Sequence, residues 1–91
     1  MPRLTWSRQA IADPEKVRGR LRERSPDAAR RTVARVIEAA ARLTAFPGLG
    51  KAGPEPGVRT LVVARSRFLL DYRVEEDVVE ILAVTDGTPR R

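Results

Sequence analysis

The sequence of 91 residues predicts a single α+β domain in which a helical hairpin packs on a mainly antiparallel sheet. Three observations lead to this prediction: a long amphipathic helical pattern after Ser25, three runs of β-branched and aromatic residues beyond residue 57, and a short alternating run at the N-terminus. The predicted order is β-α-α-β-β-β around one core. We expect one domain over 1–91, with a helical hairpin at about 8–46, a strand meander at about 58–84 and a short basic tail at 85–91.

The N-terminal segment predicts a strand followed by a helix. Leu4 and Trp6 alternate with polar neighbours, which gives the strand one apolar face. The residues from there to position 24 have apolar side chains at helical spacing, but Pro14 interrupts the pattern. Either one helix begins at Ser7 and kinks before Pro14, or a short turn precedes a separate helix capped by Asp13. We expect a kink or a break here.

The strongest helical pattern runs from Ser25 to Phe46. Ser25 suits the N-cap position, and the following proline and aspartate suit the first turn. Pro47 and the glycines after it end the helix. The apolar residues expected to face the core are Ala29, Val33, Val36, Ile37, Ala40 and Leu43, and the opposite face carries Arg31, Arg35, Glu38 and Arg42.

The C-terminal half predicts three strands after an irregular loop, PGLGKAGPEPG. The strands are Val58–Ala64, Phe68–Val74 and Val78–Val84, and the short polar links between them predict an antiparallel meander. The expected core face of the middle strand comprises Phe68, Leu70, Tyr72 and Val74, while Leu69, Asp71 and Arg73 form a partly exposed face that could be a working surface. All four of the aromatic residues Trp6, Phe46, Phe68 and Tyr72 are expected in the core.

Composition restricts the chemistry. The chain has no cysteine and no histidine, which leaves no thiolate or imidazole for nucleophilic catalysis or metal binding, so we expect neither a metal nor a cofactor. There is no apolar run of signal-peptide or bilayer-spanning length, so we expect a cytoplasmic protein without membrane contacts. Residues 1–51 have a net charge of 12 − 5 = +7 and residues 52–91 one of 6 − 7 = −1, which indicates an acidic partner for the helical half.

Four arginines on or between the later strands are candidate binding residues: Arg59, Arg65, Arg67 and Arg73. They could form one patch that contacts phosphate or an acidic protein surface, or they could be ordinary solvated residues. Asp71 and Glu80 are the carboxylates expected within strands. Their expected role is to pair with a cross-strand arginine such as Arg59 or Arg73 rather than to bind a metal.

The order of several short motifs resembles the RelE/ParE superfamily of bacterial toxins from type II toxin–antitoxin systems, and its ParE-like branch in particular. These motifs are LTWS, SPDAARR, FPGLGKAG, VRTLVV, DYRV and the closing VEILAV-x-DG. The resemblance implies the fold expected above and a growth inhibitor that a cognate antitoxin neutralises. Of the targets that the resemblance implies, we expect DNA gyrase. The alternatives are a RelE-like ribosome-dependent mRNA endoribonuclease and a degenerate toxin that retains only antitoxin binding.

The residues that the family uses match only in part. Arg59 falls where RelE-like nucleases have a basic residue, but Leu69 and Thr88 or Pro89 stand where they have arginines, and Asp86-Gly87 replaces the His-Gly of many ParE-like members. We therefore expect surface binding rather than catalysis. If the protein were a nuclease, Arg59, Arg65, Arg67 and Arg73 would hold phosphate. The candidate target-binding residues are these four together with Asp86, Arg90 and Arg91.

The resemblance also implies a hetero-oligomer with an antitoxin whose acidic, partly disordered tail folds onto the toxin. The candidate antitoxin-binding residues are Arg31, Arg35, Arg42 and Leu69. Two seats are possible, a groove between the helical hairpin and the sheet or an exposed edge strand.

Overall fold

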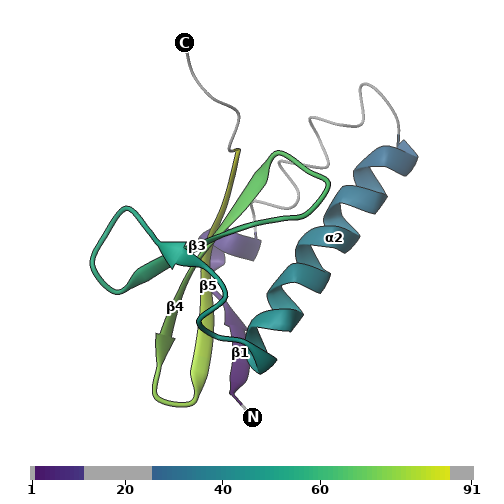
Figure 1. Ribbon diagram of the computed structural model, residues 1–91. Helices are drawn as coiled ribbons and strands as arrows, with labels where there is room; N and C mark the ends of the chain where they lie inside the picture. Colours follow the sequence, from purple (N-terminus) through teal and green to yellow (C-terminus); the bar gives the residue numbers. More distant parts are fainter. Residues whose placement is uncertain (1, 12–25, 87–91) are drawn as a thin grey trace.

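A computed structural model describes residues 2–11 and 26–86 of the chain. One long helix, α2 (Pro26–Ala45), lies across one face of a five-stranded sheet (Figure 1). The strands are β1 (Arg3–Trp6), β2 (Lys51–Ala52), β3 (Val58–Val62), β4 (Phe68–Glu75) and β5 (Val78–Asp86). No helix within these two ranges is long and apolar enough to cross a membrane.

The strand order is β1-β5-β4-β3-β2, and β3, β4 and β5 form the predicted antiparallel meander. β1 pairs with β5 in parallel, from Arg3 opposite Val78 to Trp6 opposite Ile81. The backbone N–H of Ser7 continues this edge by donating to Ile81 O at 2.9 Å. The predicted α+β class is therefore confirmed, with the N-terminal strand placed beside the C-terminal one.

The helical residues 8–11 follow β1 at once, and Ser7 caps them as one of the two predicted arrangements requires. Its hydroxyl accepts from Ala10 N at 3.1 Å and donates to Leu82 O at 2.8 Å. The rest of the predicted first helix, the effect of Pro14 and the basic tail from residue 87 lie outside the described residues.

α2 has the predicted bounds and most of the predicted core face. The buried residues on it are Ala29, Thr32, Val33, Val36, Ala40 and Leu43. The prediction for Ile37 was wrong, because its side chain is 53% exposed. Successive helical residues are about 100° apart, so with Val36 facing the sheet its neighbour points toward solvent.

The core lies between α2 and the sheet and contains Leu43, Val63, Leu70, Tyr72, Val79 and Ile81, each 0% exposed. Trp6 packs against it from β1. Two predicted core residues are exposed instead: Phe46 is 60% exposed because it follows the end of α2, and Val74 is 36% exposed beside the turn that follows β4. The predicted division of β4 into a core face and a partly exposed face is otherwise confirmed. We call the second face, with Leu69, Asp71 and Arg73, the open face.

The loop after α2 was predicted to lack regular structure, which was wrong at two residues. β2 pairs with β3 through Lys51 opposite Thr60 and Ala52 opposite Arg59. Gly53 N then donates to Val58 O at 2.7 Å and closes the hairpin, in which Gly57 has a φ of 81°. β3 ends at Val62, two residues earlier than predicted, while β4 and β5 extend further, to Glu75 and Asp86.

Candidate functional site

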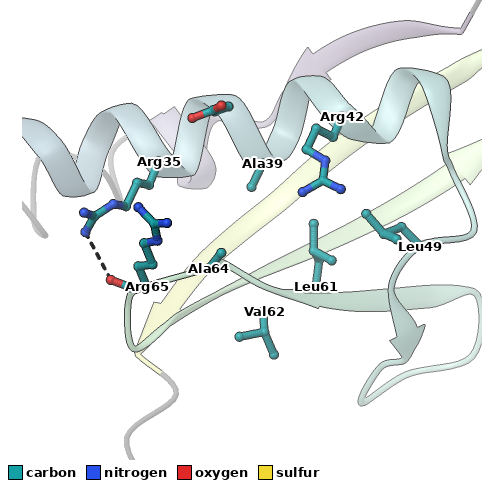
Figure 2. A pocket seen from close by; sticks show the side chains of 9 residues that line it. Arg35, Ala39, Arg42, Leu49, Leu61, Val62, Ala64 and Arg65 are labelled. Carbon is teal, nitrogen blue, oxygen red and sulfur yellow. Dashed lines mark hydrogen bonds between the residues drawn. The ribbon is translucent and has the colours of Figure 1, made fainter.

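A groove of about 380 Å³ runs between α2 and the outer edge of β3 (Figure 2). α2 contributes part of its polar face, and the loop after α2 contributes a leucine. β3 and the β3–β4 turn form the other wall. The lining residues are Arg35, Glu38, Ala39, Arg42, Leu49, Leu61, Val62, Ala64 and Arg65.

The helical repeat determines which residues of α2 reach the groove. Arg35, Ala39 and Arg42 are separated by four and three residues and therefore lie on one face of the helix. Figure 2 shows both arginine side chains extending from α2 toward β3. The two arginines lie next to the buried face of α2. That face packs on the core, and the arginine side chains remain at the surface.

Charge in the groove is positive. Among the described residues that line it, three arginines against Glu38 give 3 − 1 = +2. Arg35 donates through Nη1 to the backbone oxygen of Arg65 at 3.1 Å, which connects α2 to the β3–β4 turn. Arg65 has a φ of 61°, a left-handed conformation that turns the chain at this point. Arg35 and Arg65 thus lie together, and Arg42 lies further along the groove toward Leu49 (Figure 2).

Apolar surface is exposed in the same groove. Leu49 is 43% exposed at one end of the groove, and Leu61 and Ala39 are partly buried between it and the core. Val62 borders the groove at the edge of β3, but its 65% exposed side chain is opposite Leu69 and therefore belongs to the open face. The groove therefore offers apolar contact area from Leu49 and Leu61 beside its arginines.

The backbone of β3 is open along this groove. β2 covers only Arg59 and Thr60, so within residues 2–11 and 26–86 no strand pairs with Leu61 and Val62 on the outer side. Val63 N–H donates inward to Phe68 O at 3.0 Å, and the alternation of an antiparallel ladder therefore directs the Val62 N–H outward. This edge can accept another strand.

The structure does not bring the four predicted arginines into one patch. Arg59 is opposite Tyr72 and shares the helix-side face, where its Nη1 donates to Gly50 O at 2.8 Å. Arg67 Nε lies 3.5 Å from Asp86 Oδ2, and its guanidinium lies over the Phe68 ring at 5.7 Å. Arg73 lies on the open face, and Arg65 in the groove.

The strand carboxylates have mixed partners. Asp71 accepts from Thr60 Oγ1 at 2.8 Å, so its cross-strand partner on the open face is a hydroxyl where an arginine was predicted. Glu80 is opposite Arg73 as expected, although the ion pair of Arg73 is with Glu75, at 3.9 Å between Nε and Oε1. A second pocket surrounds them, lined by Thr5, Arg73, Glu75, Glu76, Val78 and Glu80. Across the described ranges, no three potential ligand residues are grouped to hold a metal ion.

Of the predicted antitoxin-binding residues, Arg35 and Arg42 line the groove. Arg31 is exposed on α2 but does not line it, and Leu69 is on the open face. Arg90 and Arg91 lie outside the described residues. Sequence reasoning missed the apolar members, Leu49, Leu61 and Val62. A leucine within an otherwise polar, Pro- and Gly-rich loop was the available signal for Leu49.

Comparison with known proteins identifies the family. The family model for the ParE toxin of the type II toxin–antitoxin system parDE matches residues 4–88 of this chain. This chain belongs to the ParE toxin family. A curated relative of this ParE-family protein, "Putative toxin Y4kP" of Sinorhizobium fredii (strain NBRC 101917 / NGR234), is 34% identical over 82 residues, which are 90% of this chain and 84% of that protein.

Solved structures agree with this assignment. A chain of the chromosomal ParDE TA system from P. aeruginosa superposes on the ParE-family chain with a TM-score of 0.86 and 30% identity, covering 94% of this chain and 96% of that one. The isolated E. coli RelE toxin gives a TM-score of 0.68 at 16% identity, covering 99% and 88%. A chain of the intact E. coli RelBE toxin–antitoxin complex gives 0.67 at 17%, covering 99% and 100%. The two E. coli structures show the shared fold, and the predicted superfamily and fold are confirmed.

Proposed function

We propose that this ParE-family toxin binds an acidic, extended segment of a cognate antitoxin in the α2–β3 groove, and that the free toxin inhibits DNA gyrase by occupying a protein surface. The observation that carries the first part is the combination of Arg35, Arg42 and Arg65 with exposed Leu49 in one groove, which borders the open edge of β3 at Val62. Support for an antitoxin partner comes from the ParDE system and the RelBE complex among the similar structures.

The groove offers each kind of interaction that such a segment needs. Its arginines attract carboxylates and accelerate association, its apolar residues provide the area that desolvation requires, and the outer edge of β3 offers backbone hydrogen bonds. Between the two seats expected from the sequence, this arrangement favours a combined one, because the groove and the open edge adjoin at Val62.

Membership of the ParE family supports gyrase as the target, since the ParE-like branch is the one that the sequence motifs resemble. The positions of the arginines favour binding over RNA cleavage. A nuclease needs cations gathered where charge develops in the transition state. Here Arg59 is bonded to a loop carbonyl, Arg67 is paired with Asp86 and Arg73 lies on the other face of the sheet.

Two assays on the purified protein test the target. We expect inhibition of DNA supercoiling by gyrase, with message left intact on translating ribosomes. Codon-phased cleavage of mRNA with normal supercoiling would contradict the proposal and support the RelE-like alternative. Loss of both activities, with antitoxin binding retained, would identify a degenerate toxin.

A further inference from the structure

The hydroxyl of Tyr72 is buried beneath the loop that leaves α2. The side chain is 0% exposed, and its oxygen donates to Pro47 O at 2.7 Å and accepts from Gly50 N at 2.8 Å. Arg59, the cross-strand partner of Tyr72, donates to Gly50 O at 2.8 Å. Side chains of β3 and β4 therefore hold both backbone polar groups of Gly50.

This arrangement explains why β2 is only two residues long. The β2–β3 register places Lys51 opposite Thr60 and Ala52 opposite Arg59. The same register, continued toward α2, would place Gly50 opposite Leu61 and Leu49 opposite Val62. Instead Leu49 N donates back to Phe46 O at 3.1 Å and Gly50 N is held by Tyr72. The chain leaves the sheet at Gly50, and none of the described strands covers the edge at Val62.

Only glycine fits where the chain leaves the sheet. A Cβ at Gly50 would lie 2.8 Å from both Cε1 and the hydroxyl of Tyr72 and 2.9 Å from Thr60 O. Contacts that short with backbone and with a fully packed ring cannot be relieved by rotating one flexible side chain. The close approach of Gly50 to Tyr72 is thus built into the packing of the core.

We infer that Tyr72 and Arg59 are positioning residues for partner binding: by holding Gly50, they keep the β3 edge free and fix Leu49 at the end of the groove. Neither residue lines the groove, so they act through the position of the loop. This inference rests on the proposed binding of an antitoxin segment in the groove. Without these hydrogen bonds, the 47–50 loop would move freely or pair Leu49 with Val62, where it would compete with a partner strand.

The test compares Tyr72→Phe and Arg59→Ala with Ser7→Ala in the full-length chain. Ser7 is a matched control, because its hydroxyl also donates to one backbone carbonyl and accepts from one backbone amide, at the far edge of the sheet. Backbone ¹⁵N relaxation at Leu49 and cross-strand NOEs between Leu49 and Val62 report the loop without any partner. Calorimetry with the purified cognate antitoxin reports affinity.

We expect Tyr72→Phe and Arg59→Ala to change the relaxation of Leu49 or to produce Leu49–Val62 NOEs, and to weaken binding about tenfold, while Ser7→Ala stays within about twofold. If Tyr72→Phe fails to fold, Arg59→Ala alone decides between the outcomes, since the Arg59 side chain is exposed. Unchanged Leu49 relaxation with wild-type affinity would overturn the inference. A wild-type protein that binds no partner, while Leu49 is released in the variants, would contradict the proposed function and leave the loop mechanism standing.

Discussion

Arginines in this protein are distinguished by their nearest partner rather than by their position in the sequence. Arg59 donates a hydrogen bond to Gly50 O, and Arg67 forms an ion pair with Asp86. Arg35 and Arg42 face a groove in which cations outnumber carboxylates, so an incoming acidic group meets uncompensated positive charge there. These are the arginines that should determine the affinity and the rate of association with an acidic partner.

Arg42→Ala tests this at the level of one residue. We expect it to weaken antitoxin binding by roughly 1 kcal/mol, about fivefold, mainly through slower association. Stopped-flow measurements at two ionic strengths check both the rate and its salt dependence. Arg31→Ala is the matched control on the same helix, outside the groove. Equal effects of the two substitutions would show that the whole helix face, and not the groove, attracts the partner.

Two glycines of one loop make a second comparison. A Cβ at Gly50 meets Tyr72 and Thr60 below 3.0 Å, whereas one at Gly48 meets nothing within 4 Å. Overpacking of this kind costs roughly 1–3 kcal/mol of unfolding free energy, so Gly50→Ala should be destabilised by at least that amount. Gly48→Ala should remain within about 1 kcal/mol of wild type. Urea denaturation measures both, and a stable Gly50→Ala would refute the described packing.

At the scale of elements, α2 has two separate roles. Its buried stripe attaches it to the sheet, and the adjacent polar face forms one wall of the groove. Because both faces derive from one helical repeat, the core fixes the direction in which Arg35 and Arg42 point. β3 has a comparable division, since its inner side is paired with β4 and part of its outer side has no partner among the described strands.

The two faces of α2 should respond differently to truncation. Leu43 is 0% exposed, and Leu43→Ala should cost about 2–5 kcal/mol through lost burial and a cavity. Ile37 is 53% exposed, and Ile37→Ala should stay within about 1 kcal/mol. Thermal unfolding followed by circular dichroism checks the difference. Comparable losses would mean that Ile37 is covered in solution.

A substitution can block the open edge of β3 and leave the β3–β4 hydrogen bonds intact. The Val62 N–H points outward, so Val62→Pro removes a donor that the β3–β4 ladder does not use. If the partner adds a strand at this edge, its affinity should fall at least about tenfold, whereas Val62→Thr should bind within about threefold of wild type. Calorimetry with the antitoxin measures both, and tight binding to a folded Val62→Pro variant would exclude strand addition here.

Over the whole molecule, charge divides with the fold. Residues 1–51 hold the excess of 12 − 5 = +7, and residues 52–91 hold 6 − 7 = −1. The groove draws arginines from both parts, because Arg65 comes from the strand half and stands beside Arg35. The second pocket has Glu75, Glu76 and Glu80 against Arg73, so the two concave surfaces carry opposite charge. An acidic segment should therefore select the groove.

Local patterns were sufficient for the elements that the sequence predicted well. The bounds and period of α2, the meander and the core side of β4 follow from neighbouring residues alone. The features that were predicted wrongly depend on residues far away in the sequence. Phe46 is exposed because the chain turns there to bring Pro47 to Tyr72, 25 positions further on, and β2 forms because β3 lies beside it. The groove joins three such segments. Its arginines were therefore proposed from the sequence for two different sites, and the contribution of Leu61 and Val62 could not be predicted.

Hydrogen–deuterium exchange of the free toxin and of its antitoxin complex tests the central claim most directly. We predict that complex formation slows exchange of the Val62 amide and of the backbone around Leu49 and Arg65, and leaves the open face around Arg73 and Glu80 unchanged. Slowed exchange around Arg73 and Glu80, with Val62 exchanging as fast as in the free protein, would contradict the assignment of the α2–β3 groove as the antitoxin site.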